Sequence, residues 1–119
     1  MSRTRASAKA AGTRFETSIA ACLAEHLDDR IERRRQTGAR DRGDLSGWRY
    51  GGQRVVAELK DTSRITLGTW VNEAETERLN DDAGVGLVIA KRRGHGDPLD
   101  QCVVMTVRDL VSLLTGERP

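Results

Sequence analysis

Two carboxylates and a lysine stand at spacings that suit metal-dependent hydrolysis. Glu58 and Lys60 close an apolar run (residues 55–57), and side chains two residues apart in a strand point to the same face of a sheet. Asp44 precedes them, on the other side of a Gly-Gly pair (51–52) that is typical of a tight hairpin turn. Antiparallel pairing across that turn would bring Asp44 opposite a position near 59, beside the Glu58 and Lys60 side chains.

Converging carboxylates of this kind form an oxygen-rich site that suits Mg²⁺ or Mn²⁺ and leaves coordination positions for water and a phosphate oxygen. A neighbouring lysine could position or deprotonate the attacking water and stabilise charge on the phosphate. The alternative interpretation is a surface salt bridge between Glu58 and Lys60, with Asp44 as a turn residue. The apolar run before the pair favours the metal site, because buried charges are usually paired or ligate a metal.

The elements that would position these residues alternate between helices and strands. Apolar residues recur every three to four positions from Phe15, and Thr13 with Glu16 forms a capping-box pattern, which predicts the start of a helix. Runs rich in β-branched residues, bounded by glycines, predict strands. In chain order we expect a helix at 13–28, strands at 31–36, 44–50 and 53–60, a helix at 69–81, strands at 85–90 and 102–107, and a helix at 108–114.

This order, α-β-β-β-α-β-β-α, predicts an α/β fold with a mixed central sheet flanked by helices. A chain of 119 residues has room for one domain, which we place at residues 12–119. Residues 1–11 are polar and basic, and we expect them to form a flexible N-terminal arm.

Asp44, followed by Glu58-Leu59-Lys60 on an apolar strand, resembles the core of the PD-(D/E)xK nucleases, in which a strand hairpin delivers an acid and an E-x-K triplet. The small archaeal-type Holliday junction resolvases, and similar resolvases of bacteriophages, add a glutamate at the head of the first helix, where this chain has Glu16. The resemblance covers residues 12–107 and depends more on the order of helices and strands than on the identity of single residues. It implies a restriction-endonuclease-like fold and DNA hydrolysis.

By this resemblance, Asp44 and Glu58 would ligate Mg²⁺, for which Mn²⁺ would substitute, together with the backbone carbonyl of Leu59. Lys60 would act on the water and the phosphate, and Glu16 would complete the acidic cluster. Glu16 also has a simpler interpretation, as the capping partner at the helix start.

The sequence departs from the family pattern at two places. Gly43 stands where many members have a proline before the acid. In many relatives the second helix also offers a glutamine to the site. The residues that could take that place here are Glu73, Glu75 and Glu77, and the pattern does not choose among them.

Basic residues are concentrated toward the N-terminus. Residues 1–42 hold ten arginines and lysines against six acidic residues, whereas residues 95–119 hold two against four. Such an asymmetry favours a polyanionic partner, although each basic residue alone could be an ordinary solvated charge. As contacts to DNA phosphates we predict Arg3, Arg5, Lys9, Arg14, Arg40, Arg42 and Arg64.

The resemblance implies branched DNA, with a four-way junction as the preferred substrate. Because such a junction is symmetric, its resolution calls for two equivalent active sites, and we expect a homodimer. Other endonucleases of this fold, acting on duplex or flap DNA, are an alternative. So is a non-catalytic DNA-binding module, and a structural or partner-binding domain is the least favoured.

Composition excludes several other classes of protein. No run approaches the roughly 20 apolar residues of a membrane-spanning helix, and the N-terminus lacks the apolar segment of a secretory signal. We therefore expect no membrane association and a cytoplasmic location. Two cysteines are too few for a disulfide framework or a zinc site, and the four aromatic residues form no row that would stack bases.

Overall fold

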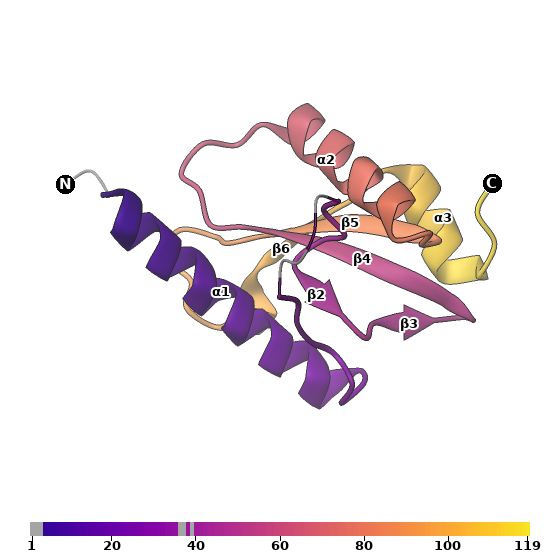
Figure 1. The fold of residues 1–119 in the computed structure, drawn as a ribbon, viewed down its shortest axis with the longest axis horizontal. Coiled ribbons are helices and arrows are strands. Elements are labelled where there is room, and N and C mark those ends of the chain that lie inside the picture. The colour runs from indigo at the N-terminus through magenta and orange to yellow at the C-terminus, as the bar shows by residue number, and fades with distance from the viewer. Residues whose placement is uncertain (1–3, 36–37, 39) are drawn as a thin grey trace.

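In the computed structural model, which describes residues 4–35, 38 and 40–119, helices cover both faces of a mixed sheet (Figure 1). The chain therefore has the α/β architecture and mixed sheet that its pattern predicts. The elements in chain order are α1 (Arg5–His26), β1 (Glu32–Arg33), β2 (Leu45–Ser46), β3 (Arg49–Tyr50), β4 (Gln53–Lys60), α2 (Leu67–Asn80), β5 (Val85–Ala90), the 3-10 helix η1 (Pro98–Asp100), β6 (Cys102–Val104) and α3 (Val107–Thr115).

The main sheet has the strand order β3-β4-β5-β6, and β1 pairs with β2 in a separate short ladder. The two central strands, β4 and β5, are parallel, with Lys60 opposite Ala90, whereas β3 and β6 are antiparallel to their neighbours. Helix α2 connects the parallel pair. The carboxyl ends of β4 and β5 therefore lie side by side at one edge of the sheet.

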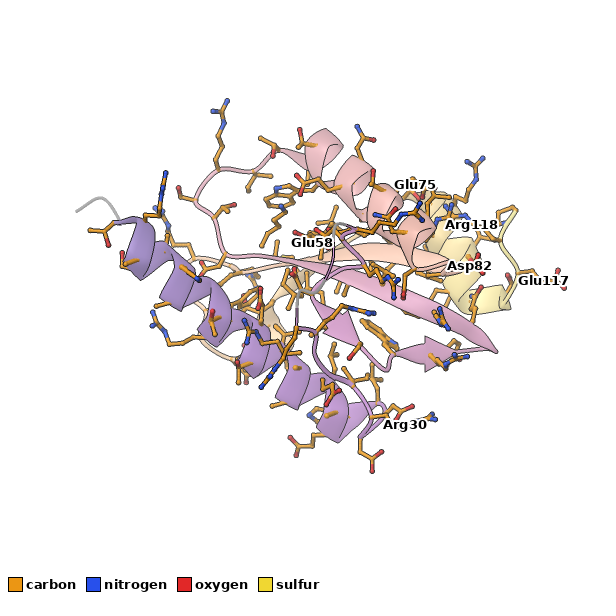
Figure 2. The ribbon with its side chains drawn as sticks, in the orientation of Figure 1. Arg30, Glu58, Glu75, Asp82, Glu117 and Arg118 are labelled. Atoms are coloured by element: carbon orange, nitrogen blue, oxygen red, sulfur yellow. The ribbon has the colours of Figure 1, made fainter. Side chains whose placement is uncertain are left out.

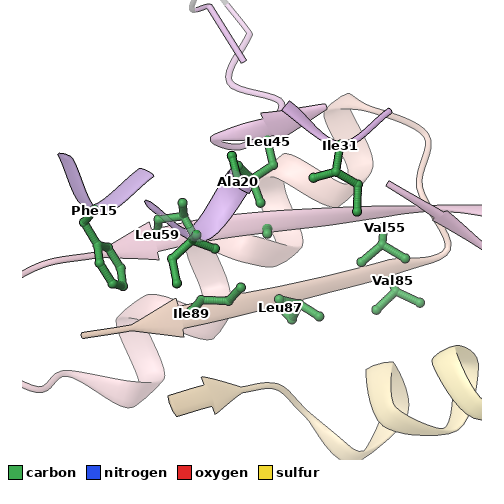
Figure 3. Close-up of a cluster of buried hydrophobic side chains, with 11 residues drawn as sticks. Phe15, Ala20, Ile31, Leu45, Val55, Leu59, Val85, Leu87 and Ile89 are labelled. Carbon is green, nitrogen blue, oxygen red and sulfur yellow. The ribbon is translucent and has the colours of Figure 1, made fainter. Parts of the chain in front are cut away.

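Strand β4 is the central element of the fold, and its side chains alternate between two environments. Val55, Ala57 and Leu59 belong to the larger core cluster, together with Phe15 of α1 and residues of β5 (Figure 3). Trp70 and Ala74 of α2 instead pack in a second cluster with alternate β5 residues. Glu58 and Lys60 alternate with the residues of the larger cluster along β4, so they share a face of the strand, as predicted from the two-residue period of a strand.

The first helix begins eight residues earlier than the sequence pattern predicts. Thr4 is its N-cap, and the Thr4 Oγ1 accepts a hydrogen bond of 3.0 Å from the Ser7 backbone N–H. Residues 5–11 are therefore helical, so the helix start and the capping box predicted at Thr13 and Glu16 are wrong, and the arm predicted at 1–11 belongs to α1 from Arg5 onward. The physical reason is the run of alanines at residues 6–11, which are strong helix formers. Arg3 lies outside the described residues.

The strand predicted at 44–50 is in fact two short strands, β2 and β3. Gly47 separates them with a φ of +82°, and a Cβ at this position would collide with the backbone carbonyl of Arg30. Only glycine tolerates both conditions, so the chain bends here instead of continuing one ladder. The strand predicted at 31–36 is also shorter, since β1 contains only Glu32 and Arg33, and residues 36 and 37 lie outside the described part.

The predictions for the other elements are largely confirmed. The Gly51-Gly52 turn joins β3 to β4, with Tyr50 opposite Gln53, and β5 has the predicted bounds. Helix α3 ends at Gly116 in the left-handed conformation, as the sequence pattern indicates, but β6 is shorter than predicted. Among the residues that the structure describes, no helix has both the length and the apolar character needed to cross a membrane.

Candidate functional site

The hairpin places Asp44 beside the end of β4. The Asp44 backbone N–H donates to the carbonyl of Ala57 (2.9 Å), and the Asp44 Oδ2 accepts a hydrogen bond of 2.7 Å from the backbone N–H of Leu59. Asp44 therefore lies opposite positions 57–59, as the pairing argument predicts. Its carboxylate is held against the β4 backbone next to Glu58.

Gly43 explains why this chain has no proline before the acid. Gly43 has a φ of +90°, and a Cβ there would lie 2.8 Å from the Val56 Cγ1 and 3.0 Å from the Ala57 carbonyl oxygen. Proline is restricted to a φ near −65° and could not adopt this conformation. Glycine at position 43 is thus a local requirement for bringing Asp44 close to β4.

Lys60 at the end of β4 contacts two carboxylates, one on β4 and one on α2. Its Nζ lies 2.7 Å from the Glu73 Oε2 and 3.4 Å from the Glu58 Oε1, and 17% of its side chain is exposed. Burial alone would lower the pKa of Lys60. The hydrogen bond to Glu73 and the charge of Glu58 outweigh burial, so the pKa lies above its ordinary value. Lys60 is therefore a charged donor at neutral pH, suited to a phosphate oxygen rather than to removing a proton.

Two further carboxylates join Glu58 from other elements. Glu77 of α2 is 3% exposed, and Asp41 lies in the loop before β2. One oxygen from each of Asp41, Glu58 and Glu77 lies within 4.8 Å of the other two. Asn80 fixes the loop to α2, since its Nδ2 donates to the Asp41 backbone carbonyl (2.7 Å). The acidic cluster therefore draws on three separate segments.

Burial and neighbouring carboxylates raise the pKa values of Asp44 and Glu77. Burial and then the neighbouring charge of Glu58 raise the pKa of Asp44 to about 7, although the hydrogen bond from Leu59 opposes the shift. Burial raises the pKa of Glu77 far above its ordinary value, with further contributions from Glu58 and Asp41. So many acceptors at close range need either protons or a cation at neutral pH.

The three glutamates of α2 have different partners. Glu73 binds Lys60, and Glu75 pairs with Arg78 and Arg118. Figure 2 shows Glu75 and Arg118 together near α3, away from Glu58 at the centre of the molecule. Of the three alternatives that the sequence left open, Glu77 is the one whose carboxylate joins the Glu58 cluster.

Glu16 of α1 lies at the margin of this site. Its Oε2 is 2.7 Å from the Arg33 Nε, and its negative charge contributes to the raised pKa of Asp44. It is therefore near enough to act on Asp44, but it is not one of the three carboxylates grouped around Glu58.

Sequence reasoning missed Asp41, although it considered both neighbours, Arg40 and Arg42, as DNA contacts. The available signal was the Asx turn, in which the Asp41 Oδ1 accepts a hydrogen bond of 2.9 Å from the Gly43 N–H. An acidic residue tied by a turn to the segment that carries Asp44 must lie close to it.

The predicted DNA contacts that the structure describes all have exposed side chains: Arg5, Lys9, Arg14, Arg40, Arg42 and Arg64. Arg14 of α1 also lines a surface hollow with Lys91, Ser18 and Gln101. The Lys91 backbone N–H donates to the Lys60 carbonyl (2.9 Å), so this basic hollow lies next to the end of β4.

The donor set is suited to a hard divalent cation. Asp41, Asp44, Glu58 and Glu77 offer carboxylate oxygens, which Mg²⁺ and Mn²⁺ prefer over the nitrogen and sulfur ligands typical of zinc. Comparisons with models of protein families, with curated proteins and with solved structures find no match to this chain.

Proposed function

We propose that this protein is a metal-dependent endonuclease that hydrolyses phosphodiester bonds in DNA. The observation that carries the proposal is the convergence of Asp44, Glu58 and Lys60 at the end of β4, with the Asp44 carboxylate bonded to the Leu59 N–H and Lys60 within 3.4 Å of Glu58. A surface salt bridge would not require a second, half-buried carboxylate beside the pair. The restriction-endonuclease-like core that the sequence resembles belongs to the same proposal.

In this proposal the chain's residues have separate tasks. Asp44, Glu58 and the Leu59 carbonyl would hold Mg²⁺, with Glu16 at the margin. The ion would polarise the phosphate and increase the acidity of water. Lys60, kept charged by Glu73 and Glu58, would donate to a phosphate oxygen and stabilise the negative charge that develops there. The exposed arginines and lysines near the site would hold the DNA backbone without reading its sequence.

We propose branched DNA as the substrate, with a four-way junction preferred, and a cytoplasmic homodimer as the acting species. The support for a junction is the sequence resemblance, together with basic side chains on both α1 and the loop after β5 that would follow more than one DNA strand. Two equivalent sites on a twofold axis would match the symmetry of the junction.

The test compares a labelled four-way junction with a linear duplex of the same sequence, each with Mg²⁺, with Mn²⁺ and with EDTA. We expect paired symmetric cuts in the junction alone, and none with EDTA. Cutting of both substrates would support the alternative, an endonuclease of broader specificity. A folded protein that binds DNA with a steep salt dependence but never cuts would contradict the enzyme proposal and favour a non-catalytic binding module.

Helix α3 supports the homodimer proposal because it exposes a row of apolar side chains. The residues buried on α3 are polar, Asp109 and Ser112, where Asp109 bonds the Gly86 N–H (2.9 Å). Its exposed side carries apolar residues spaced i, i+3, i+4, i+7, the pattern that packs one helix against another. These residues are Val107, Leu110, Val111 and Leu114.

We expect the paired substitution Val107→Lys and Leu114→Lys to convert a dimer into a folded monomer, because both side chains are at least 70% exposed in the single chain. Sedimentation velocity measures the change. Ile65→Lys, at an equally exposed apolar residue between β4 and α2, is the matched control and should remain dimeric. A monomeric wild type, or a variant that stays dimeric, would contradict this interface.

A further inference from the structure

Two carboxylate oxygens between β4 and α2 have no hydrogen-bond donor among the described residues. They are the Oε2 atoms of Glu58 and Glu77, and both are buried. Glu77 as a whole is 97% buried, since only 3% of it is exposed. An ionised carboxylate can only accept hydrogen bonds, so a buried one without a donor carries a large desolvation cost. At neutral pH either a proton shared by the two side chains or a bound cation is needed between them.

The spacing of three carboxylates at this place is close to that required by a divalent cation. Oxygens of Asp41, Glu58 and Glu77 lie within 4.8 Å of one another. Mg²⁺ binds oxygen at about 2.0–2.1 Å, which places two of its ligand oxygens no more than about 4.2 Å apart. Small side-chain shifts would close the group around one ion.

This group is distinct from the position beside Asp44. The Asp44 Oδ2 accepts a hydrogen bond from the Leu59 N–H, and Asp44 belongs to the segment that pairs with β4. Glu77 comes instead from α2, and Asp41 from the loop that Asn80 ties to α2. Glu58 is the residue that the two positions share, because its carboxylate acts on both Asp44 and Glu77.

We propose that Asp41, Glu58 and Glu77 form a second divalent-cation site, joined to the first through the Glu58 carboxylate. The first position rests on the proposed nuclease function, whereas the second rests on the donorless oxygens and the three-carboxylate geometry. A pair of ions bridged by one carboxylate can stabilise both the attacking and the leaving oxygen of a phosphodiester. Glu77 would then supply from α2 a ligand that the sequence motif does not contain.

The test counts Mn²⁺ ions bound to the free protein, without DNA, by electron paramagnetic resonance at neutral pH. We expect two ions on the wild type and one on Glu77→Gln. Glu75→Gln is the matched control on the same helix, because Glu75 pairs with Arg78 and Arg118 and lies outside the cluster. It should still bind two ions.

Asp41→Asn is a second variant that keeps the test valid if Glu77→Gln fails to fold. Asp41 is exposed, so its replacement leaves the core unchanged, and we expect at least a tenfold loss of affinity for the second ion. Equal ion numbers on the wild type and on folded Glu77→Gln would overturn the proposal and assign a proton to the gap between Glu58 and Glu77.

These outcomes separate the second site from the nuclease proposal. Two bound ions on a protein that cuts no DNA would uphold the site and contradict the function. Efficient cleavage by a protein whose ion number is unchanged by Glu77→Gln would uphold the function and contradict the second site.

Discussion

Glu58→Gln is expected to abolish cation-dependent cleavage and, at the same time, to stabilise the metal-free fold. The carboxylate of Glu58 lies at the centre of the cluster, where it acts on Asp44, Glu77 and Lys60. Loss of its charge removes a ligand from each proposed cation position. We expect the cleavage rate to fall by at least about 10³-fold, which corresponds to about 4 kcal/mol of activation free energy.

The same substitution relieves repulsion among buried carboxylates. Glutamine keeps the size of Glu58, and its amide can donate a hydrogen bond to Glu77 or Asp44, while Lys60 retains Glu73 at 2.7 Å. The free energy of unfolding without metal should therefore rise by about 1 to 3 kcal/mol near pH 8. A residue kept for structure alone would give the opposite sign.

Urea denaturation with EDTA and single-turnover cleavage with Mg²⁺ measure the two effects on one preparation. Glu32→Gln is the control, since Glu32 is an exposed carboxylate on β1, and it should change neither quantity. A Glu58→Gln protein that is less stable than the wild type, or that cuts at the wild-type rate, would contradict this assignment of Glu58.

The metal-free protein is also expected to lose stability as the pH rises through the acidic range to neutrality. Burial and the charge of Glu58 raise the pKa of Asp44 to about 7 in the folded state, against about 3.9 in an unfolded chain. Between these values the folded state holds a proton that the unfolded state has released, so the free energy of unfolding falls with rising pH. At 1.36 kcal/mol per pKa unit, Asp44 contributes a loss of about 4 kcal/mol.

Urea titrations in EDTA at several pH values between about 4 and 8 measure this dependence. Asp44→Asn removes the titrating group while keeping an oxygen that can accept from the Leu59 N–H, so its profile should be flatter than that of the wild type. Mg²⁺ should restore stability near pH 8, by about 2.7 kcal/mol at a hundred times its dissociation constant. Identical pH profiles for the two proteins would refute the assignment.

Local sequence chemistry was enough to predict the centre of the fold and part of the candidate site. The apolar runs that form β4 and β5, and the Gly51-Gly52 turn, depend on backbone preferences and on the two-residue period of a strand. The same period places Glu58 and Lys60 on one face. Hairpin pairing brings Asp44 to them, because it links residues close in sequence.

Predictions failed where distant segments decide local conformation. The strand predicted at 44–50 is interrupted because Gly47 packs against the backbone of Arg30, a contact that no local pattern encodes. The predicted start of α1 is wrong for a different reason. The basic residues near the N-terminus favour a flexible arm, whereas the alanines between them favour a helix.

Some residues of the candidate site are placed by local sequence, and others are placed by contacts between distant segments. Residue types, strand period and hairpin pairing determine that Asp44, Glu58 and Lys60 meet. Which glutamate of α2 joins the cluster depends on the rotation of the helix about its axis. Burial of Trp70 and Ala74 sets that rotation and directs Glu77, rather than Glu73 or Glu75, toward Glu58. The position of Asp41 depends on the hydrogen bond that the Asn80 side chain donates to the Asp41 backbone carbonyl. Those contacts join residues far apart in the chain, so only the packed tertiary structure brings their carboxylates together.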